Sequence, residues 1–123
     1  MENYDAKFLI CDDSILARKN MNEVLKRFGY SNIVEVSNGQ DAISTYMREH
    51  PDIVFLDIVM PIKDGITATR EIISFDADAK VIVVSSVGTQ SNLREAIKAG
   101  AKDFIQKPID ENLLKQVIEH NLG

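Results

Sequence analysis

Five polar residues stand at the ends of four separate apolar runs, and their types could do chemistry together. Asp12 and Asp13 follow the first of these runs, and Asp57 follows another. Ser85 ends a third run and Lys107 follows a fourth. If these runs are parallel strands, their C-terminal ends lie on one edge of one sheet, where binding sites of open α/β sheets form. Three carboxylates, a hydroxyl and an ammonium would then converge on one point.

The three carboxylates favour a Mg²⁺ site. At an effective dielectric near 20, unit charges about 4 Å apart repel by roughly 4 kcal/mol per pair, so such a cluster needs a cation or raised pKa values. Oxygen ligands suit a hard ion, and Mg²⁺ uses one or two carboxylates with waters and phosphate oxygens. No His or Cys follows these runs to indicate zinc.

Each position also has an ordinary structural explanation. The segment Asp12–Ser14 could cap a helix and place favourable charge at its positive end. Asp57 could accept hydrogen bonds from loop amides, and a loop lysine such as Lys107 is usually solvated. Because all of these positions fall at strand ends, we favour the chemical interpretation.

The elements that must position these residues alternate along the chain. Apolar runs of strand length fall at about 8–11, 33–36, 53–57, 81–85 and 104–107. Four of them are nearly continuous, which is typical of strands covered on both faces. The run at 33–36 alternates and carries a charge, so we expect an edge strand.

The segments between the strands have helical period. The second stripe is Ala42, Ile43, Tyr46 and Met47; the fourth is Leu93, Ala96 and Ile97; the fifth is Leu113, Leu114, Val117 and Ile118. The first stripe is Ala17, Met21, Val24, Leu25 and Phe28. Gly29 follows it as a natural helix stop, and His50–Pro51 ends the second stripe.

This alternation predicts an α/β fold, with a parallel sheet between two layers of helices. Right-handed crossovers leave few topologies, and an edge position for the second strand favours the order 2-1-3-4-5 of the flavodoxin-like (βα)5 sandwich. The first and third strands, which carry Asp12, Asp13 and Asp57, are then neighbours at the switch point.

Length and composition limit the class of protein. The 123 residues predict one domain, 1–123, and the net charge of −5 disfavours nucleic-acid binding. No apolar run approaches the roughly 20 residues needed to span a bilayer, and the polar N-terminus is no signal peptide. One cysteine, Cys11, excludes an internal disulfide and fits a cytoplasmic location; we expect it to pack in the core. No heptad repeat indicates a coiled coil, so we expect a monomer.

The chain resembles the receiver domain of two-component response regulators from about residue 7 to 120. The matching motifs are Asp12–Asp13, Asp57 with Met60–Pro61 and Asp64–Gly65, Ser85, Lys107–Pro108 and the segment 95–104. Within the family it is most similar to the single-domain chemotaxis regulators. The family itself has the strand order 2-1-3-4-5, so that order is not an independent prediction.

The resemblance implies a phosphorylation switch rather than an enzyme. Asp57 would accept phosphoryl from a sensor histidine kinase or phosphotransfer protein, and Lys107 would pair with a phosphoryl oxygen. Ser85, where threonine is commoner, would swing to bond another oxygen. Phe104, often tyrosine in the family, would move inward as an aromatic switch. The face of the fourth helix, fifth strand and fifth helix would then change its affinity for a downstream protein.

The resemblance also implies how Mg²⁺ is held. Asp13 and Asp57 would be direct ligands, Asp12 a ligand through water, and the backbone carbonyl of Val59 a further ligand. A phosphatase of the haloacid dehalogenase type is a rival, but it requires a second Asp where Val59 stands. A flavin or nucleotide module would need glycine-rich motifs that the chain lacks. A receiver cut from a longer regulator, with a DNA-binding or enzymatic output domain, stays an alternative.

Overall fold

The computed structural model describes residues 4–86 and 90–123, in which five strands alternate with five helices. The strands are β1 (Lys7–Cys11), β2 (Asn32–Val36), β3 (Ile53–Leu56), β4 (Val81–Ser85) and β5 (Asp103–Gln106). The helices are α1 (Ile15–Arg27), α2 (Gly39–Glu49), α3 (Gly65–Phe75), α4 (Gln90–Ala99) and α5 (Glu111–Leu122). Every predicted strand lies within one residue of its observed bounds.

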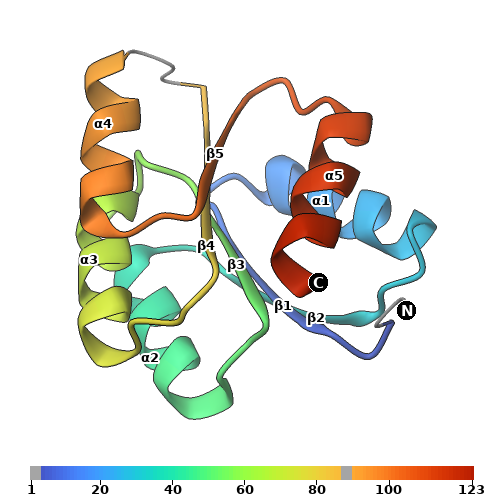
Figure 1. Ribbon diagram of the computed structural model, residues 1–123, viewed down its shortest axis with the longest axis horizontal. Coiled ribbons are helices and arrows are strands. Elements are labelled where there is room, and N and C mark those ends of the chain that lie inside the picture. The colour runs from blue at the N-terminus through green and yellow to red at the C-terminus, as the bar shows by residue number, and fades with distance from the viewer. Residues whose placement is uncertain (1–3, 87–89) are drawn as a thin grey trace.

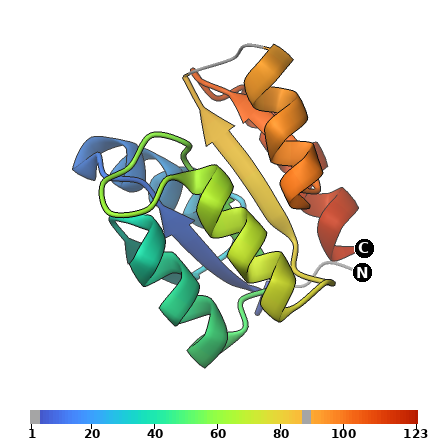
Figure 2. The same ribbon diagram turned by 90° about the vertical axis from the view of Figure 1, so that its left-hand side faces the viewer.

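The strands form one parallel sheet in the order β2-β1-β3-β4-β5, which confirms the predicted flavodoxin-like fold. Helices α1 and α5 cover one face, and α2, α3 and α4 cover the other (Figure 1). Figure 2 shows the latter three side by side in front of the sheet. Strand β2 lies at one edge and is half exposed, as its alternating sequence predicted.

Alternation along β1 divides the core between the two faces of the sheet. Phe8 and Ile10 belong to a buried cluster with residues of α1 and α5, whereas Leu9 and Cys11 belong to one with residues of α2 and α3. Burial on both faces explains the nearly continuous apolar sequence of the inner strands. Their ends are therefore held rigidly, which matters for the groups that follow them.

Not every residue of the predicted apolar stripes is buried. Alanines make the buried contacts of α4, at Ala96 and Ala99. Small side chains let the helix lie close to the sheet, so larger neighbours in the stripe are left at its margin. The four exposed residues of these stripes are Met47 (44%), Leu93 (41%), Ile97 (50%) and Leu113 (44%).

The predicted helix ends are confirmed by the backbone. Gly29 has φ +103°, and the hydrogen bonds from Gly29 and Tyr30 back into α1 close the helix. His50 has φ 47° and caps α2 in the left-handed conformation. In residues 4–86 and 90–123, no helix combines the length and apolar character that crossing a bilayer requires.

Candidate metal and phosphoryl site

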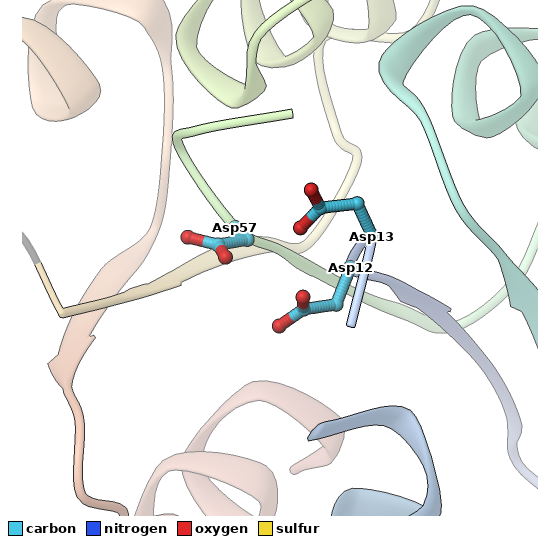
Figure 3. A group of neighbouring side chains, drawn as sticks. All are labelled: Asp12, Asp13 and Asp57. Atoms are coloured by element: carbon cyan, nitrogen blue, oxygen red, sulfur yellow. The ribbon is translucent and has the colours of Figure 1, made fainter. Parts of the chain in front are cut away.

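Two acidic segments meet because β1 and β3 are neighbours in register. Cys11 pairs with Leu56, so Asp12 and Asp57 leave adjacent strand ends at equivalent positions. The Asp57 backbone N–H donates to the Cys11 carbonyl at 3.0 Å, which extends the ladder to the site. Figure 3 shows Asp12 and Asp13 extending from the end of β1 and Asp57 from the end of β3.

The three carboxylates form the predicted acid cluster. One oxygen from each of Asp12, Asp13 and Asp57 lies within 4.8 Å of the others. Asp12 is buried, Asp57 is partly buried and Asp13 is exposed, so the cluster opens to solvent on the Asp13 side. Such spacing places three oxygen donors where one cation can contact them together.

The helix-capping explanation applies to Ser14 rather than to the acids. The Ser14 hydroxyl accepts a hydrogen bond from the Ala17 N–H at 3.1 Å and caps α1. One oxygen of Asp12 accepts from the Ser14 N–H at 2.9 Å, which fixes the side chain but leaves its second oxygen for the site. Asp13 has no hydrogen bond or ion pair with residues that the structure describes. Capping of α1 therefore leaves carboxylate oxygens of Asp12 and Asp13 available to bind a metal ion.

Lys107 follows the edge strand β5, two strands away from β3, and its side chain extends to the acid cluster. Its Nζ lies 2.6 Å from Asp12 Oδ2 and 3.4 Å from Asp57 Oδ2. Burial alone would lower the pKa of Lys107, but the hydrogen bond to Asp12 and the charges of both acids outweigh it and raise the pKa. The ammonium is therefore charged at neutral pH and holds two of the three carboxylates.

The neighbouring strand places Ser85 at the same edge. Ser85 pairs with Gln106 in register, and its carbonyl accepts from the Lys107 N–H at 2.9 Å. The Ser85 side chain is fully buried. The Lys107–Pro108 peptide bond is cis. The structure thus brings the ends of β1, β3, β4 and β5 to one site, and the role of Ser85 there stays a prediction.

Two further residues named by the family resemblance lie on β5 and in the loop after β3. Phe104 on β5 is half buried and packs against a small cluster formed by Ile58, Val83, Ala96 and Ala101. Val59, two residues after Asp57, has an exposed side chain. The switching of Phe104 and the metal contact of the Val59 carbonyl stay predictions.

The loop after β3 is folded tightly onto the Asp57 backbone. Asp64 caps α3 by accepting from the Thr67 N–H at 2.8 Å. The Gly65 N–H donates to the Ile58 carbonyl at 2.8 Å, and a Cβ at Gly65 would lie 1.9 Å from the Asp57 carbonyl oxygen. The Asp64–Gly65 motif therefore has a local cause, because only glycine permits this approach.

The sequence did not indicate two residues behind the acid pair. Arg18 donates from Nη1 to the Asp12 backbone carbonyl at 2.6 Å. Its Nε lies 3.3 Å from Oε1 of Glu35 on β2. The one available signal is the acidic residue in an otherwise apolar edge strand, a pattern that predicts exposure but does not identify an ion pair.

The donor set fits a hard divalent cation. The thiol of Cys11 donates to the Asn38 carbonyl at 3.1 Å and contacts Met60 Sδ at 3.2 Å, away from the cluster. Burial, and next the charge of Asp12, raise the pKa of this thiol to about 12, so it is not a thiolate ligand. Carboxylate oxygens are left as the side-chain ligands, which suits Mg²⁺.

A parallel α/β domain with an acid cluster and a lysine at its switch point belongs to the class of phosphoacceptor domains. The model of the response regulator receiver domain family matches residues 8–119, and the chain belongs to this family. Family membership makes it a phosphoacceptor switch rather than a dedicated enzyme.

Known relatives resemble the chain over nearly all of its length. The chemotaxis protein CheY of Bacillus subtilis is 40% identical over 117 residues, 95% of this chain and 98% of that protein. CheY of Thermotoga maritima is 41% identical over 112 residues, 91% and 93% of the two chains. A crystal structure of a CheX–CheY complex with BeF₃ and Mg²⁺, from Borrelia burgdorferi, contains a chain 33% identical to this one. The TM-score is 0.89, covering 96% of this chain and 90% of that one.

Proposed function

We propose that the chain is a phosphorylation-activated signalling switch of a two-component phosphorelay. Asp57 accepts the phosphoryl group from the phosphohistidine of a sensor histidine kinase or of a phosphotransfer protein, with Mg²⁺ bound at the acid cluster. The observation that carries the proposal is the contact of Lys107, from β5, with Asp12 at 2.6 Å and Asp57 at 3.4 Å. This contact places the Lys107 ammonium beside the nucleophile Asp57, where it can bind an oxygen of the transferred phosphoryl group.

In the proposed reaction, a carboxylate oxygen of Asp57 attacks the phosphorus of the donor. The new O–P bond forms as the N–P bond to the donor imidazole breaks, and that nitrogen keeps the electron pair and takes up a proton from solvent. Lys107 donates to a phosphoryl oxygen and offsets its charge. Attack of water on the phosphorus later breaks the O–P bond, which releases inorganic phosphate and restores the free carboxylate of Asp57.

The four proposed metal ligands follow two neighbouring strands: Asp12 and Asp13 come after β1, and Asp57 and Val59 come after β3. Asp13 and Asp57 hold Mg²⁺ directly, Asp12 holds it through water, and the Val59 carbonyl completes the protein's share. When bound, Mg²⁺ supplies neutralising charge to the phosphoryl oxygens. Within the chain, the task of Asp12 is to keep Lys107 beside the nucleophile, as the 2.6 Å contact indicates.

Labelling by a small phosphodonor tests the assignment. We expect acetyl phosphate to label the protein in a Mg²⁺-dependent way and Asp57→Asn to abolish the label. The control is Asp64→Asn, which makes the same change in the same loop at the exposed N-cap of α3. An amide oxygen still caps a helix, so this variant should be labelled normally. Undiminished labelling of Asp57→Asn would reject the proposal.

The proposed output runs through Ser85 and Phe104 to the face of α4, β5 and α5. Phosphorylation puts a group of about −1.5 to −2 charge in place of the single carboxylate charge and favours the loop arrangement that supplies donors. Phe104 packs against the buried cluster that includes Ala96 of α4, which gives the change a route. Exposed apolar side chains on α4 and α5, including Ile97 and Leu113, can then contribute to binding a target.

A conservative variant separates phosphorylation from this output. Ser85→Ala should be labelled like the wild type but should lose most of the beryllofluoride-induced NMR shift changes in β5 and α5. Ser74→Ala, an exposed serine on α3, is the control. Full shift changes in Ser85→Ala would remove Ser85 from the switch.

The proposed partners are a histidine kinase or phosphotransfer protein and a downstream target protein. We propose that the chain acts as a monomer in the cytoplasm. The relatives named above favour chemotaxis signalling. The alternative is a receiver that works within a larger regulator with a DNA-binding or enzymatic output domain. Affinity capture with and without beryllofluoride distinguishes them, because a motor or chemotaxis protein supports the first and bound DNA supports the second.

A further inference from the structure

We propose that Arg18 is a positioning residue for the metal ligands, and that Glu35 holds Arg18 in place. The inference rests on the proposed Mg²⁺ site. Arg18 lies on α1, one turn after the N-cap Ser14, and Glu35 lies on the edge strand β2. The pair joins the loop of the acid cluster to two elements that contribute no ligand.

The contact made by Arg18 is with the backbone between the two acids. Its Nη1 donates to the Asp12 carbonyl oxygen at 2.6 Å, a short charge-assisted hydrogen bond. This carbonyl belongs to the planar peptide unit that links Asp12 to Asp13. Holding the plane of that peptide holds the Asp13 N and Cα in place and so restricts the positions that the Asp13 carboxylate can reach.

Asp13 needs this support more than its neighbours do. Asp12 is held by the Ser14 N–H and by Lys107, and Asp57 is held by Lys107 and by the Ile58 N–H. Asp13 is exposed and has no such bond among the described residues. Its position therefore depends on the backbone that Arg18 holds.

Glu35 orients Arg18. The Arg18 Nε lies 3.3 Å from Glu35 Oε1, and Oε2 of Glu35 accepts from the Asn22 amide at 2.9 Å. The Arg18 side chain is only 16% exposed, and that of Glu35 is 35% exposed. In register, Glu35 pairs with Ile10, two residues before Asp12. The guanidinium is thus held at two of its nitrogens, which a lysine ammonium cannot reproduce.

Charge and position make opposite predictions for metal binding. A guanidinium near the acid cluster repels Mg²⁺, so removing it would tighten binding if charge were its whole effect. If Arg18 positions Asp13, removing it weakens binding. The sign of the change in Mg²⁺ affinity therefore separates the two roles, and it does not depend on phosphorylation activity.

The experiment is calorimetric titration of Mg²⁺ into the full chain, in parallel with urea unfolding in EDTA to show that each variant is folded. We expect Arg18→Ala to bind Mg²⁺ about tenfold more weakly, at the low end of the range for residues that orient metal ligands. The control is Arg27→Ala, on the same helix. Arg27 pairs with Glu111 at 2.8 Å and is 56% exposed, so its loss removes the same charge without touching the acid pair. The Mg²⁺ affinity of Arg27→Ala should equal that of the wild type or be slightly higher.

Two more variants test the link to Glu35. Arg18→Lys keeps the charge and should recover only part of the affinity. Glu35→Gln should weaken Mg²⁺ binding in the wild-type background and have little further effect in Arg18→Ala. Equal effects of Glu35→Gln in both backgrounds would contradict a role through Arg18.

The failure of this inference is distinct from failure of the proposed function. If the wild type binds no Mg²⁺, or if Asp13→Asn binds Mg²⁺ with the same affinity as the wild type, the proposed metal site itself is wrong. If the wild type binds Mg²⁺ and Arg18→Ala binds it equally or more tightly, the metal site stands and the positioning role of Arg18 is refuted.

Discussion

Replacing Asp13 by asparagine should stabilise the metal-free protein and destabilise the Mg²⁺-bound protein relative to wild type. The change removes one negative charge from a cluster whose carboxylate oxygens lie within 4.8 Å of one another. It also removes the exposed carboxylate that is proposed to be a direct ligand. The two effects have opposite signs, so the order of stability should reverse with the metal.

The magnitude in EDTA follows from the spacing. Unit charges 4.8 Å apart repel by about 0.9 kcal/mol at the dielectric of water. Asp13 is exposed, so this value applies rather than the larger one for a buried pair. Its two neighbours together give about 1.7 kcal/mol, and the charge of Lys107 opposes part of it. We therefore expect the free energy of unfolding to rise by about 1 kcal/mol.

Mg²⁺ should more than cancel this gain. A ligand at a hundred times its dissociation constant adds about 2.7 kcal/mol to the stability of the protein that binds it. Asp13→Asn loses a proposed ligand and should gain much less from the same Mg²⁺ concentration. Urea unfolding of both proteins, in EDTA and in excess Mg²⁺, measures all four free energies.

A control isolates the site from the overall charge. Glu119→Gln removes one negative charge from an exposed position on α5 and should change neither stability by more than a few tenths of a kcal/mol. If Asp13→Asn were less stable than the wild type in EDTA, the three carboxylates would not repel one another in the metal-free protein. If Mg²⁺ stabilised Asp13→Asn as much as it stabilises the wild type, Asp13 would not be a ligand.

Two further changes probe the supports of the site. Gly65→Ala should lower the free energy of unfolding by about 3 kcal/mol and reduce Mg²⁺-dependent labelling, because its Cβ would lie 1.9 Å from the Asp57 carbonyl oxygen; unchanged urea unfolding would contradict this. Lys107 has a pKa raised above 10.5, so its stabilising contribution is complete below that pH and is lost as pH rises through the folded value. The stability difference between wild type and Lys107→Met should thus shrink above pH 10.5, and a constant difference would show that the charge of Lys107 is not responsible. The raised pKa values of Cys11 and Tyr46 act in both proteins and cancel from this difference.

The sheet, and the edge at which the acid cluster and Lys107 meet, could be predicted because both depend on patterns of apolar and polar residues within short segments of sequence. Strands buried on both faces have continuous apolar sequences, and the polar residues after them must leave the sheet at one edge. Asp57 and Lys107 lie 50 residues apart in the chain, yet strand order alone brings them together. The strand ends themselves were predicted to within one residue.

What could not be predicted depends on how whole elements pack. The spacing of Leu93 and Ile97 identifies an apolar stripe on α4, but the stripe's position against the sheet is decided by the small residues Ala96 and Ala99. Similarly, the contact of Arg18 with Glu35 joins α1 to β2 through two long side chains. Helical period gives the face of Arg18 but neither its rotamer nor its partner.

Charge balance indicates where a conformational change must begin. Three carboxylates and the Lys107 ammonium leave the metal-free cluster with a formal charge of about −2, which one Mg²⁺ neutralises. In the proposed cycle, phosphorylation of Asp57 replaces its single charge by about −2, so the site again needs hydrogen-bond donors. Lys107 is already in contact, and its backbone N–H is bonded to the Ser85 carbonyl at the end of β4. Any movement of Lys107 or Ser85 toward the phosphoryl group therefore acts on the β4–β5 pair first. Phe104 lies on β5 and packs against the buried cluster that includes Ala96, which makes α4 the helix best placed to respond.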